Sequence, residues 1–251
     1  MAALNENTEI PLPPVPDVNP KMPWIQLGEF ESASSKTPPP QAYSPHMTGG
    51  AGMLALASAR ALLEHGLSGL ALFDLPSAIE KGKNKIQALR TDFPLSKIIT
   101  QACDVTDEKG MIAATQTAKE QLGGDLNILC CFAGMVGCVP SAEQSVDHWR
   151  KIIDVNTTGC WIAAQAVGRL AAEWTRYGIY VNTISPGYMD TVLNHGDDLA
   201  SWRRIWAERN PMRRMGSPEE LTGPVVLLCS DIGGSYVNGA DIVVDGGGLV
   251  F

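Results

Sequence analysis

Thr48-Gly49-Gly50-Ala51-Gly52 leads directly into an Ala- and Leu-rich stretch, residues 55–64, that ends before Gly66. A glycine just past the last apolar residue is a common helix stop. Further along, short apolar runs alternate with helix-like stretches. We expect strands at 70–73, 98–102, 126–132, 179–184 and 241–244, and helices at 81–90, at 108–122 and from Asp147 and Ser217 onward. Repeated strand–helix–strand units of this length predict an α/β fold, a doubly wound parallel sheet in a single domain.

The turn at residues 48–52 has the composition of a phosphate-binding loop. Its glycines would let backbone N–H groups approach a pyrophosphate at the positive end of a helix. Asp74 ends the next expected strand, where a carboxylate accepts hydrogen bonds from an adenosine ribose and repels a 2′-phosphate. These residues predict a cofactor, NAD or NADP, with Asp74 favouring NAD. The other interpretation is a plain strand-to-helix turn followed by an unrelated acidic residue.

Composition narrows the range of partners. The 251 residues carry a formal net charge of −8, and the pI near 5.0 argues against binding nucleic-acid backbones or anionic membrane surfaces. No apolar stretch approaches the roughly 18 residues of a membrane span, and no signal peptide is evident. The six cysteines show no CxxC spacing and no neighbouring His pair, so no metal site is expected. We expect a cytoplasmic protein with reduced thiols.

The N-terminal residues differ from the rest of the chain. Residues 1–46 hold ten of the seventeen prolines, which favour extended, solvated backbone over packed helix or central strand. We therefore predict a Pro-rich arm at 1–46 and a dinucleotide-binding domain at 47–251. The arm is either a plain tail or a docking segment for modules that bind proline-rich peptides.

Several short motifs follow in a fixed order: Thr48-Gly49-Gly50, Asp104-Val105, Ala133-Gly134, Asp154-Val155-Asn156, Val181-Asn182, Pro186-Gly187 and Asp245-Gly246-Gly247. In this order they resemble the short-chain dehydrogenase/reductase (SDR) family, and the likeness runs from Thr48 to Phe251. The texture is similar to fungal reductases of sugar alcohols or secondary metabolites. The resemblance implies a Rossmann-like fold and an NAD(P)-dependent oxidoreductase that interconverts a ketone and a secondary alcohol. It also implies a small-molecule alcohol or ketone substrate and homo-oligomerisation through helices.

Carried over position by position, the resemblance implies a role for each matching residue. Asn156 corresponds to the catalytic asparagine that organises the active-site helix and a proton-relay water beside the cofactor. The implied cofactor-binding residues are Thr48, Gly49, Gly52 and Leu54 at the phosphate loop, Asp74 at the ribose, Asp104 and Val105 at the adenine, Ala133 and Gly134 below the cofactor, and Pro186, Gly187, Met189 and Thr191 over the nicotinamide. For each of them, the alternative is a structural turn or core position.

The phosphate loop and the strand before it depart from the family pattern. The family loop reads Thr-Gly-x-x-x-Gly-x-Gly, which puts Met53 and Ala55 at its last two glycines, while Gly52 lies one residue early. A side chain at Met53 would crowd the pyrophosphate. Residues 42–47 should form the central first strand, but Pro45 lacks the N–H of a ladder donor, which argues against a central strand here.

The catalytic residues are a second departure. The family uses a tyrosine as general acid/base, with a lysine four residues later that lowers the tyrosine pKa, and a serine that positions the carbonyl. None of the five tyrosines in this chain has a lysine four residues after it, and the last lysine is Lys151. The tyrosines are Tyr43, Tyr177, Tyr180, Tyr188 and Tyr236. An unassisted phenol with a pKa near 10 is a poor base at neutral pH, so we predict little or no dehydrogenase turnover.

The spacing suggests how the pair was lost. The helical stretch 157–176 runs directly into the strand expected at 179–184, whereas the family has a further strand and most of another helix in between. Such a block takes about 30 residues, so the sheet should lack a strand near its middle. The alternatives to an active enzyme are a catalytically inactive relative that binds at most a dinucleotide or a protein, and a gene model mis-joined at Arg169–Leu170. The assembly state is open because an interface helix falls in the shortened region.

Overall fold

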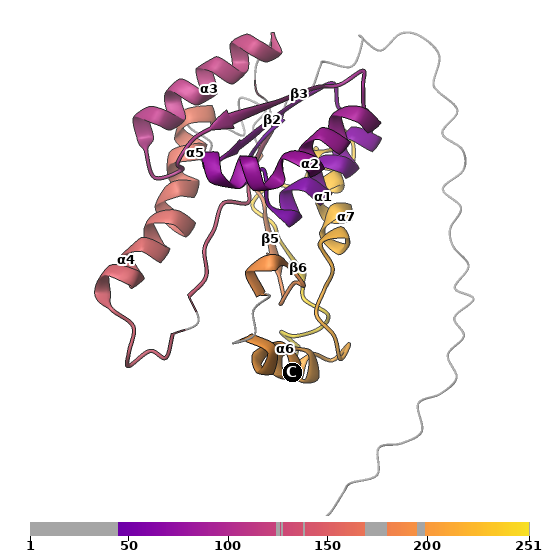
Figure 1. Cartoon of the computed structure of the whole chain (residues 1–251). Coiled ribbons are helices and arrows are strands. Elements are labelled where there is room, and N and C mark those ends of the chain that lie inside the picture. Colours follow the sequence, from indigo (N-terminus) through magenta and orange to yellow (C-terminus); the bar gives the residue numbers. More distant parts are fainter. Residues whose placement is uncertain are drawn as a thin grey trace, which may run out of the picture. The chain divides into compact units, whose positions relative to one another are not determined.

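The computed structural model describes residues 45–123, 126, 128–137, 139–168, 180–194 and 199–250, all within the compact unit that spans residues 40–251. Residues 1–44 of the expected arm lie outside the described residues, so its boundary near residue 46 stays a prediction. The α/β class is confirmed, and every strand pairing is parallel (Figure 1).

The first half of the unit builds a four-stranded sheet from strand–helix–strand units. Its strands lie in the order β3-β2-β1-β4. The elements in chain order are β1 (Pro45–Thr48), α1 (Met53–Glu64), β2 (Gly69–Asp74), α2 (Pro76–Asp92), β3 (Lys97–Ala102), α3 (Glu108–Leu122) and β4 (Ile128–Cys131). Because all four strands are parallel, their carboxyl ends share one edge of the sheet, where open α/β sheets bind ligands.

The second half adds helices and a separate pair of strands. Strands β5 and β6 form their own two-stranded parallel sheet, with Ile184 opposite Ile242. The elements are α4 (Val146–Ile153), the π-helical turn η1 (Asp154–Thr158), α5 (Gly159–Gly168), β5 (Thr183–Pro186), the 3₁₀ turn η3 (Val192–Asn194), α6 (Ala200–Arg209), the 3₁₀ turn η5 (Pro218–Leu221), α7 (Thr222–Cys229) and β6 (Asp241–Val244).

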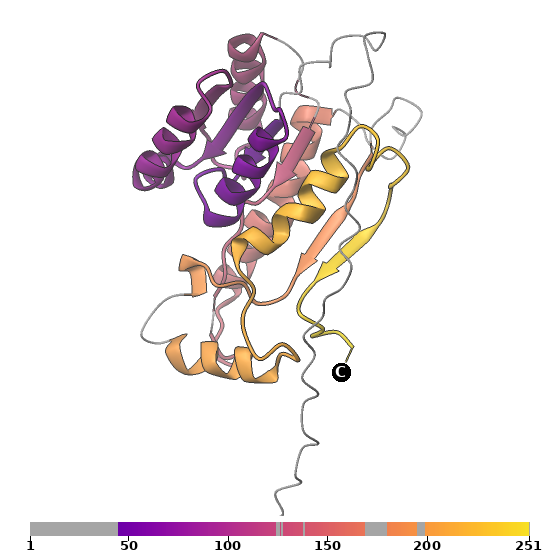
Figure 2. The same ribbon diagram turned by 90° about the vertical axis from the view of Figure 1, so that its right-hand side faces the viewer.

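The sheet is interrupted between β4 and β5. Within the ranges that the structure describes, the strands form two sheets, and β4 and β5 each pair along one edge only (Figure 2). The break lies where the sequence predicts a missing strand. Residues 169–182 connect α5 to β5. This connection is shorter than the roughly 30 residues that an additional strand with its helix requires.

The expectation that Pro45 would keep residues 42–47 out of a central strand is wrong. Strand β1 begins at Pro45 and pairs with β2 on one side and with β4 on the other. Proline is tolerated at the first residue of a strand, because the N–H it lacks lies before the ladder begins. His46, Met47 and Thr48 then supply the ladder donors.

Strand β5 begins later than the sequence predicts. The expected strand at 179–184 starts outside the described residues, and pairing begins only at Thr183. Residues 181 and 182 are held by a loop instead: Val181 N donates to Asn238 Oδ1 at 2.9 Å, and the Asn182 side chain donates to Val237 O and accepts from Ala240 N. This side-chain clamp replaces ladder bonds at the start of the strand.

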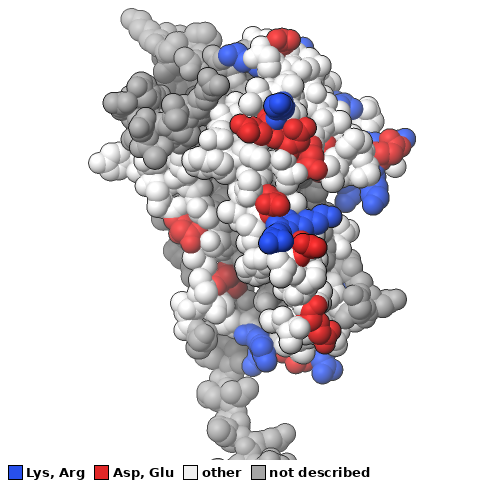
Figure 3. Space-filling model, turned by 90° about the vertical axis from the view of Figure 1, so that its left-hand side faces the viewer, with Lys and Arg blue, Asp and Glu red and all other residues white. Residues whose placement is uncertain are grey.

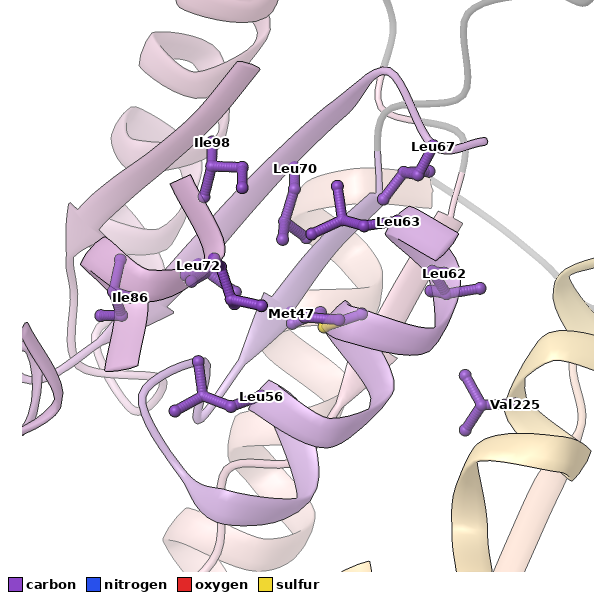
Figure 4. Close-up of a cluster of buried hydrophobic side chains, with 12 residues drawn as sticks. Met47, Leu56, Leu62, Leu63, Leu67, Leu70, Leu72, Ile86, Ile98 and Val225 are labelled. Carbon is purple, nitrogen blue, oxygen red and sulfur yellow. The ribbon is translucent and has the colours of Figure 1, made fainter. Parts of the chain in front are cut away.

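Two apolar layers pack on opposite faces of the main sheet. One joins α1, α2 and α7 to the strands and includes Met47, Leu63, Leu72, Ile86 and Val225 (Figure 4). The other joins α3 and α5 to the strands through the set Phe73, Met111, Ala118, Ile162 and Ala163. Val225 lies on α7, so the first layer also connects the β5–β6 half to the main sheet. Helices on both faces confirm the doubly wound arrangement.

Gly49 permits a backbone approach that no side chain allows. Its φ is +65°, and a Cβ there would lie 2.6 Å from Ala133 N and 2.7 Å from the Phe132 carbonyl carbon. We expect Gly49→Ala to lower the free energy of unfolding by about 3 kcal/mol, from left-handed strain plus overlap with backbone. Gly66 has φ +91° and open space around its Cβ position. Gly66→Ala therefore isolates the strain, about 1 kcal/mol. Urea unfolding measures both, and equal losses would contradict the packing argument.

Candidate dinucleotide-binding site

The predicted cofactor residues of the first half gather at the carboxyl edge of the main sheet. Thr48 ends β1, Asp74 ends β2, and Ala133 and Gly134 follow β4. Thr48 O accepts a hydrogen bond from Phe132 N, and the Ala133 amide lies 3.4 Å from Thr48 Oγ1. The structure thus brings together residues that are up to 85 positions apart in the chain.

The loop after β1 leaves the first turn of α1 without a cap. Gly52 is the N-cap residue; it forms no side-chain capping bond, and the first turn contains no acidic residue. The first N–H groups of a helix need partners from outside the helix, and they attract anions. Leu54 lies in this first turn and is half-buried. The donor set therefore suits a pyrophosphate.

The loop glycines serve packing as much as ligand approach. A Cβ at Gly50 would lie 2.8 Å from Leu72 Cα, whereas one at Gly52 would meet only Gly49 O, at 3.0 Å. Gly50 is thus a structural requirement that the sequence reasoning did not single out, although its place in a Gly-Gly pair was a signal. Met53 is half-buried at the first helical position, so the crowding expected there stays a prediction.

Asp74 links the phosphate loop to the end of β2. Its Oδ2 accepts from Ala51 N at 3.0 Å, and its Oδ1 accepts from Leu75 N at 2.8 Å. A carboxylate offers about four acceptor positions, so two remain for ribose hydroxyls. The side chain is partly exposed, as a ribose ligand must be.

Asp104 and Val105 lie in the turn after β3. Asp104 Oδ1 accepts from both the amide and the hydroxyl of Thr106, which fixes the turn. Val105 is 8% exposed, and it packs so closely on Gly159 of α5 that a Cβ there would lie 2.6 Å from Val105 Cγ2. Both residues have clear structural roles, and their predicted contact with adenine stays untested.

Asn156 lies in the π-helical turn η1 and binds backbone. Its Oδ1 accepts from Met135 N at 2.8 Å, and its Nδ2 donates to Met135 O at 2.9 Å. It therefore anchors the segment that follows Ala133 and Gly134. A π-turn in a helix often marks a functional position. Its predicted role beside a proton-relay water stays a prediction, and the sequence did not indicate Met135 as its partner, because no motif encodes that contact.

The predicted nicotinamide segment follows β5. A Cβ at Gly187 would lie 2.9 Å from Asp245 Cα, so this glycine allows β5 to approach the loop after β6. Met189 forms a parallel bridge with Gly216 and is 5% exposed, and Thr191 is 6% exposed. Pro186 ends the strand opposite Val244. Met189 and Thr191 thus have core positions in this structure.

A cavity of about 330 Å³ opens beside this segment. Its lining includes Tyr188, Met189, Asn210, Arg214 and Gly246. Tyr188 stacks on Trp206 of α6, with ring centroids 4.4 Å apart and planes 7° apart. The sequence did not predict this pair, because Tyr188 and Trp206 come together only when the loop after β5 packs against α6.

Two models of known families match the chain. One, described as short chain dehydrogenase, matches residues 46–170, and another, described as Enoyl-(Acyl carrier protein) reductase, matches residues 163–248. The fold, a parallel α/β sheet with a Gly-rich turn before α1, is typical of dinucleotide-binding proteins. The chain belongs to the short-chain dehydrogenase/reductase family, NAD(P)-dependent oxidoreductases that interconvert ketones and secondary alcohols.

Named relatives act on sugars and sugar alcohols. The chain is 29% identical to a sorbose reductase of Schizosaccharomyces pombe, over 58% of this chain and 73% of the relative. It is 25% identical to the ribulose-forming D-arabinitol 2-dehydrogenase of Candida tropicalis, over 80% and 90%. It is 39% identical to an NADP-dependent mannitol dehydrogenase of Hypocrea jecorina, over 51% of this chain and 44% of that enzyme.

Solved structures share the fold. The protein gox2181 superposes with a TM-score of 0.74 at 26% identity, over 84% of this chain and 97% of its own. A short-chain dehydrogenase/reductase from Serratia marcescens has a TM-score of 0.73 at 20% identity, over 83% of this chain and 98% of its own.

The alignment with the arabinitol dehydrogenase is 256 positions long, yet it takes in only 80% of this chain. That enzyme therefore contains residues without a counterpart here.

Proposed function

We propose that this chain binds NAD at the carboxyl edge of its main sheet and takes a sugar alcohol or the matching ketose as its small-molecule substrate. The observation that carries the proposal is the meeting of the uncapped α1 N-terminus, Asp74 and the Ala133-Gly134 turn at one edge. Bound NAD would supply the hydride acceptor. The α1 amides would hold its pyrophosphate, and Asp74 its ribose hydroxyls.

The substrate class rests on the named relatives, of which several are polyol or ketose oxidoreductases. A small polar substrate suits a protein with a net charge of −8 better than a polyanionic one does. On the face shown in Figure 3, basic side chains are interspersed with acidic ones. Among helices in the described ranges we find none with the length and hydropathy of a membrane span. A cytoplasmic location is part of the proposal.

Proton transfer is the step for which this chain is least equipped. Tyr180, Tyr188 and Tyr236 are 45%, 55% and 100% exposed, and no lysine follows residue 151 in the sequence. Both polar atoms of the Asn156 side-chain amide are hydrogen-bonded to the backbone of Met135. We therefore propose that hydride transfer is not matched by an efficient acid/base, and that turnover is weak. A lost block is supported by the edges of β4 and β5 that pair with no other described strand, and by the residues that the arabinitol dehydrogenase has in excess.

The cofactor preference gives a direct test. We expect calorimetry to find at least about fivefold tighter binding of NAD than of NADP, because a carboxylate a few ångströms from a 2′-phosphate repels it by at least about 1 kcal/mol. Asp74→Asn removes the charge but keeps an oxygen for Ala51 N, so the ratio should fall toward one. Asp104→Asn, in the turn after the neighbouring β3, should change both affinities alike.

Two results would count against this assignment. If neither nucleotide binds, the dinucleotide site fails as a whole. If NAD and NADP bind equally well to the unmodified chain, the site survives, but Asp74 does not select the ribose.

A further inference from the structure

Two pairs of cysteines meet across strand β4. Neighbouring residues of a strand point to opposite faces of the sheet, so Cys130 and Cys131 face different helices. Cys130 packs against the apolar layer of α1, α2 and α7, to which Cys229 of α7 also belongs. Leu129, on the same side as Cys131, packs against the other layer with Ile162 of α5. Cys131 shares a hydrogen bond with Cys160 of α5, and Cys130 shares one with Cys229.

The Cys131–Cys160 pair is the more accessible one. Cys131 is exposed and Cys160 half-buried, whereas Cys130 and Cys229 are both half-buried and Cys103 is buried. All five cysteines within the described ranges are free thiols. A small oxidant can therefore reach Cys131 and Cys160 without opening the core.

We infer that Cys131 and Cys160 form a redox site, in which a peroxide oxidises the two thiols to a disulfide that ties the end of β4 to α5. The Cys160 thiolate attacks one peroxide oxygen; the O–O bond breaks, water leaves after protonation, and a sulfenic acid remains. The Cys131 sulfur then attacks the Cys160 sulfur; the S–S bond forms, the S–O bond breaks, and a second water leaves. Two thiols lose two electrons and two protons, and the peroxide accepts them.

The chemistry of the pair suits these roles. The hydrogen bond from Cys131 lowers the pKa of Cys160 to about 7, so a large share of Cys160 is thiolate at neutral pH. Burial and the negative charges of Asp107 and Asp104 raise the pKa of Cys103 to about 11, which keeps that thiol protonated. We therefore assign the attack to Cys160 and the resolution of the sulfenic acid to Cys131.

The bond would cross the floor of the candidate nucleotide site. Cys131 pairs in register with Thr48, and Cys160 lies four residues after Asn156, on the same side of the helix. An effect of oxidation on NAD binding rests on the proposed function, but formation of the disulfide does not. Disulfide mapping therefore tests the redox site even if no nucleotide binds.

The test is peroxide treatment of the full chain, followed by alkylation and peptide mapping. We expect one dominant disulfide, Cys131–Cys160, that a dithiol reductant reverses, and alkylation of Cys160 at neutral pH at least about tenfold faster than of Cys103. Cys160→Ser should abolish the linkage, while the matched variant Cys229→Ser, from the deeper pair, should form it as before. A dominant Cys130–Cys229 bond, over-oxidation of Cys131 without linkage, or equal alkylation rates would overturn the inference.

Discussion

We expect the purified chain to oxidise D-arabinitol with NAD about 10²- to 10⁴-fold more slowly than the Candida tropicalis D-arabinitol 2-dehydrogenase, a relative of this chain, under the same conditions. A positioned general acid/base contributes a factor of that size. A phenol without a neighbouring lysine keeps a pKa near 10 and is largely protonated at neutral pH. Nicotinamide absorbance over a panel of polyols and ketoses gives the rates.

NAD binding must be measured together with turnover, so that an assay without detectable activity can be interpreted. Calorimetric NAD binding together with slow turnover would locate the defect in proton transfer. A rate equal to that of the complete relative would contradict the argument, since some other group would then serve the reacting oxygen.

A chimera tests the same prediction through a gain of activity. Inserting the relative's strand–helix block between Arg169 and Leu170, a junction outside the described residues, should supply a strand between β4 and β5 together with the missing tyrosine and lysine. We expect the rate to rise by at least about 10²-fold. The same chimera with that tyrosine changed to phenylalanine is the matched control. Transcript sequencing across the junction tells whether the transcript itself lacks the block or whether only the gene model omits it.

Local signals predicted most of the elements. Helix α3 and strand β6 have the bounds that the sequence predicts, because strong periodicity and clear end residues define them. Helix α2 starts earlier than expected, at Pro76, since proline fits a first helical turn. Strand β1 could not be predicted, because its central place depends on pairing with β2 and β4, which outweighs the missing donor of Pro45.

The site was predictable in its backbone but not in its contacts. The positions of Thr48, Asp74 and Gly134 followed from the strand ends, which a parallel sheet brings to one edge. The Asn156–Met135 bonds, the Tyr188–Trp206 stack and the two thiol pairs arise only from tertiary packing. Side chains that meet across elements leave no periodic trace in the sequence.

His46 should make the fold sensitive to acid. Its ring is fully buried in β1 beside Phe73, and neither ring nitrogen has a side-chain partner among the described residues. The backbone of Ile128 raises the pKa of the ring, but the effect of burial is larger. Burial lowers its pKa from 6.5 to about 3, because the charged ring would lose its hydration without gaining an ion pair. Such a group favours folding only while it is neutral.

The direction of this pH effect follows from proton binding to His46 in the folded and unfolded states. Above pH 6.5 neither state carries the proton, so His46 costs nothing in charge. As the pH falls below 6.5 the unfolded chain gains a proton that the folded chain refuses until about pH 3, so stability declines over that interval. We expect a loss of about 2 kcal/mol between pH 7 and pH 5 from this residue, against a total of about 5–15 kcal/mol for a domain.

His46→Leu should remove that slope, because an apolar side chain has no proton to refuse. Urea unfolding at pH 7, 6 and 5 measures it, and the expected result is a variant whose advantage over the unmodified chain grows by about 2 kcal/mol across the series. The surface variant His65→Gln, which replaces an exposed ring that contacts the helix carbonyl of Ala61, should follow the unmodified chain. Parallel curves for His46→Leu and the unmodified chain would mean that the buried ring titrates normally, and that water or backbone reaches it in solution.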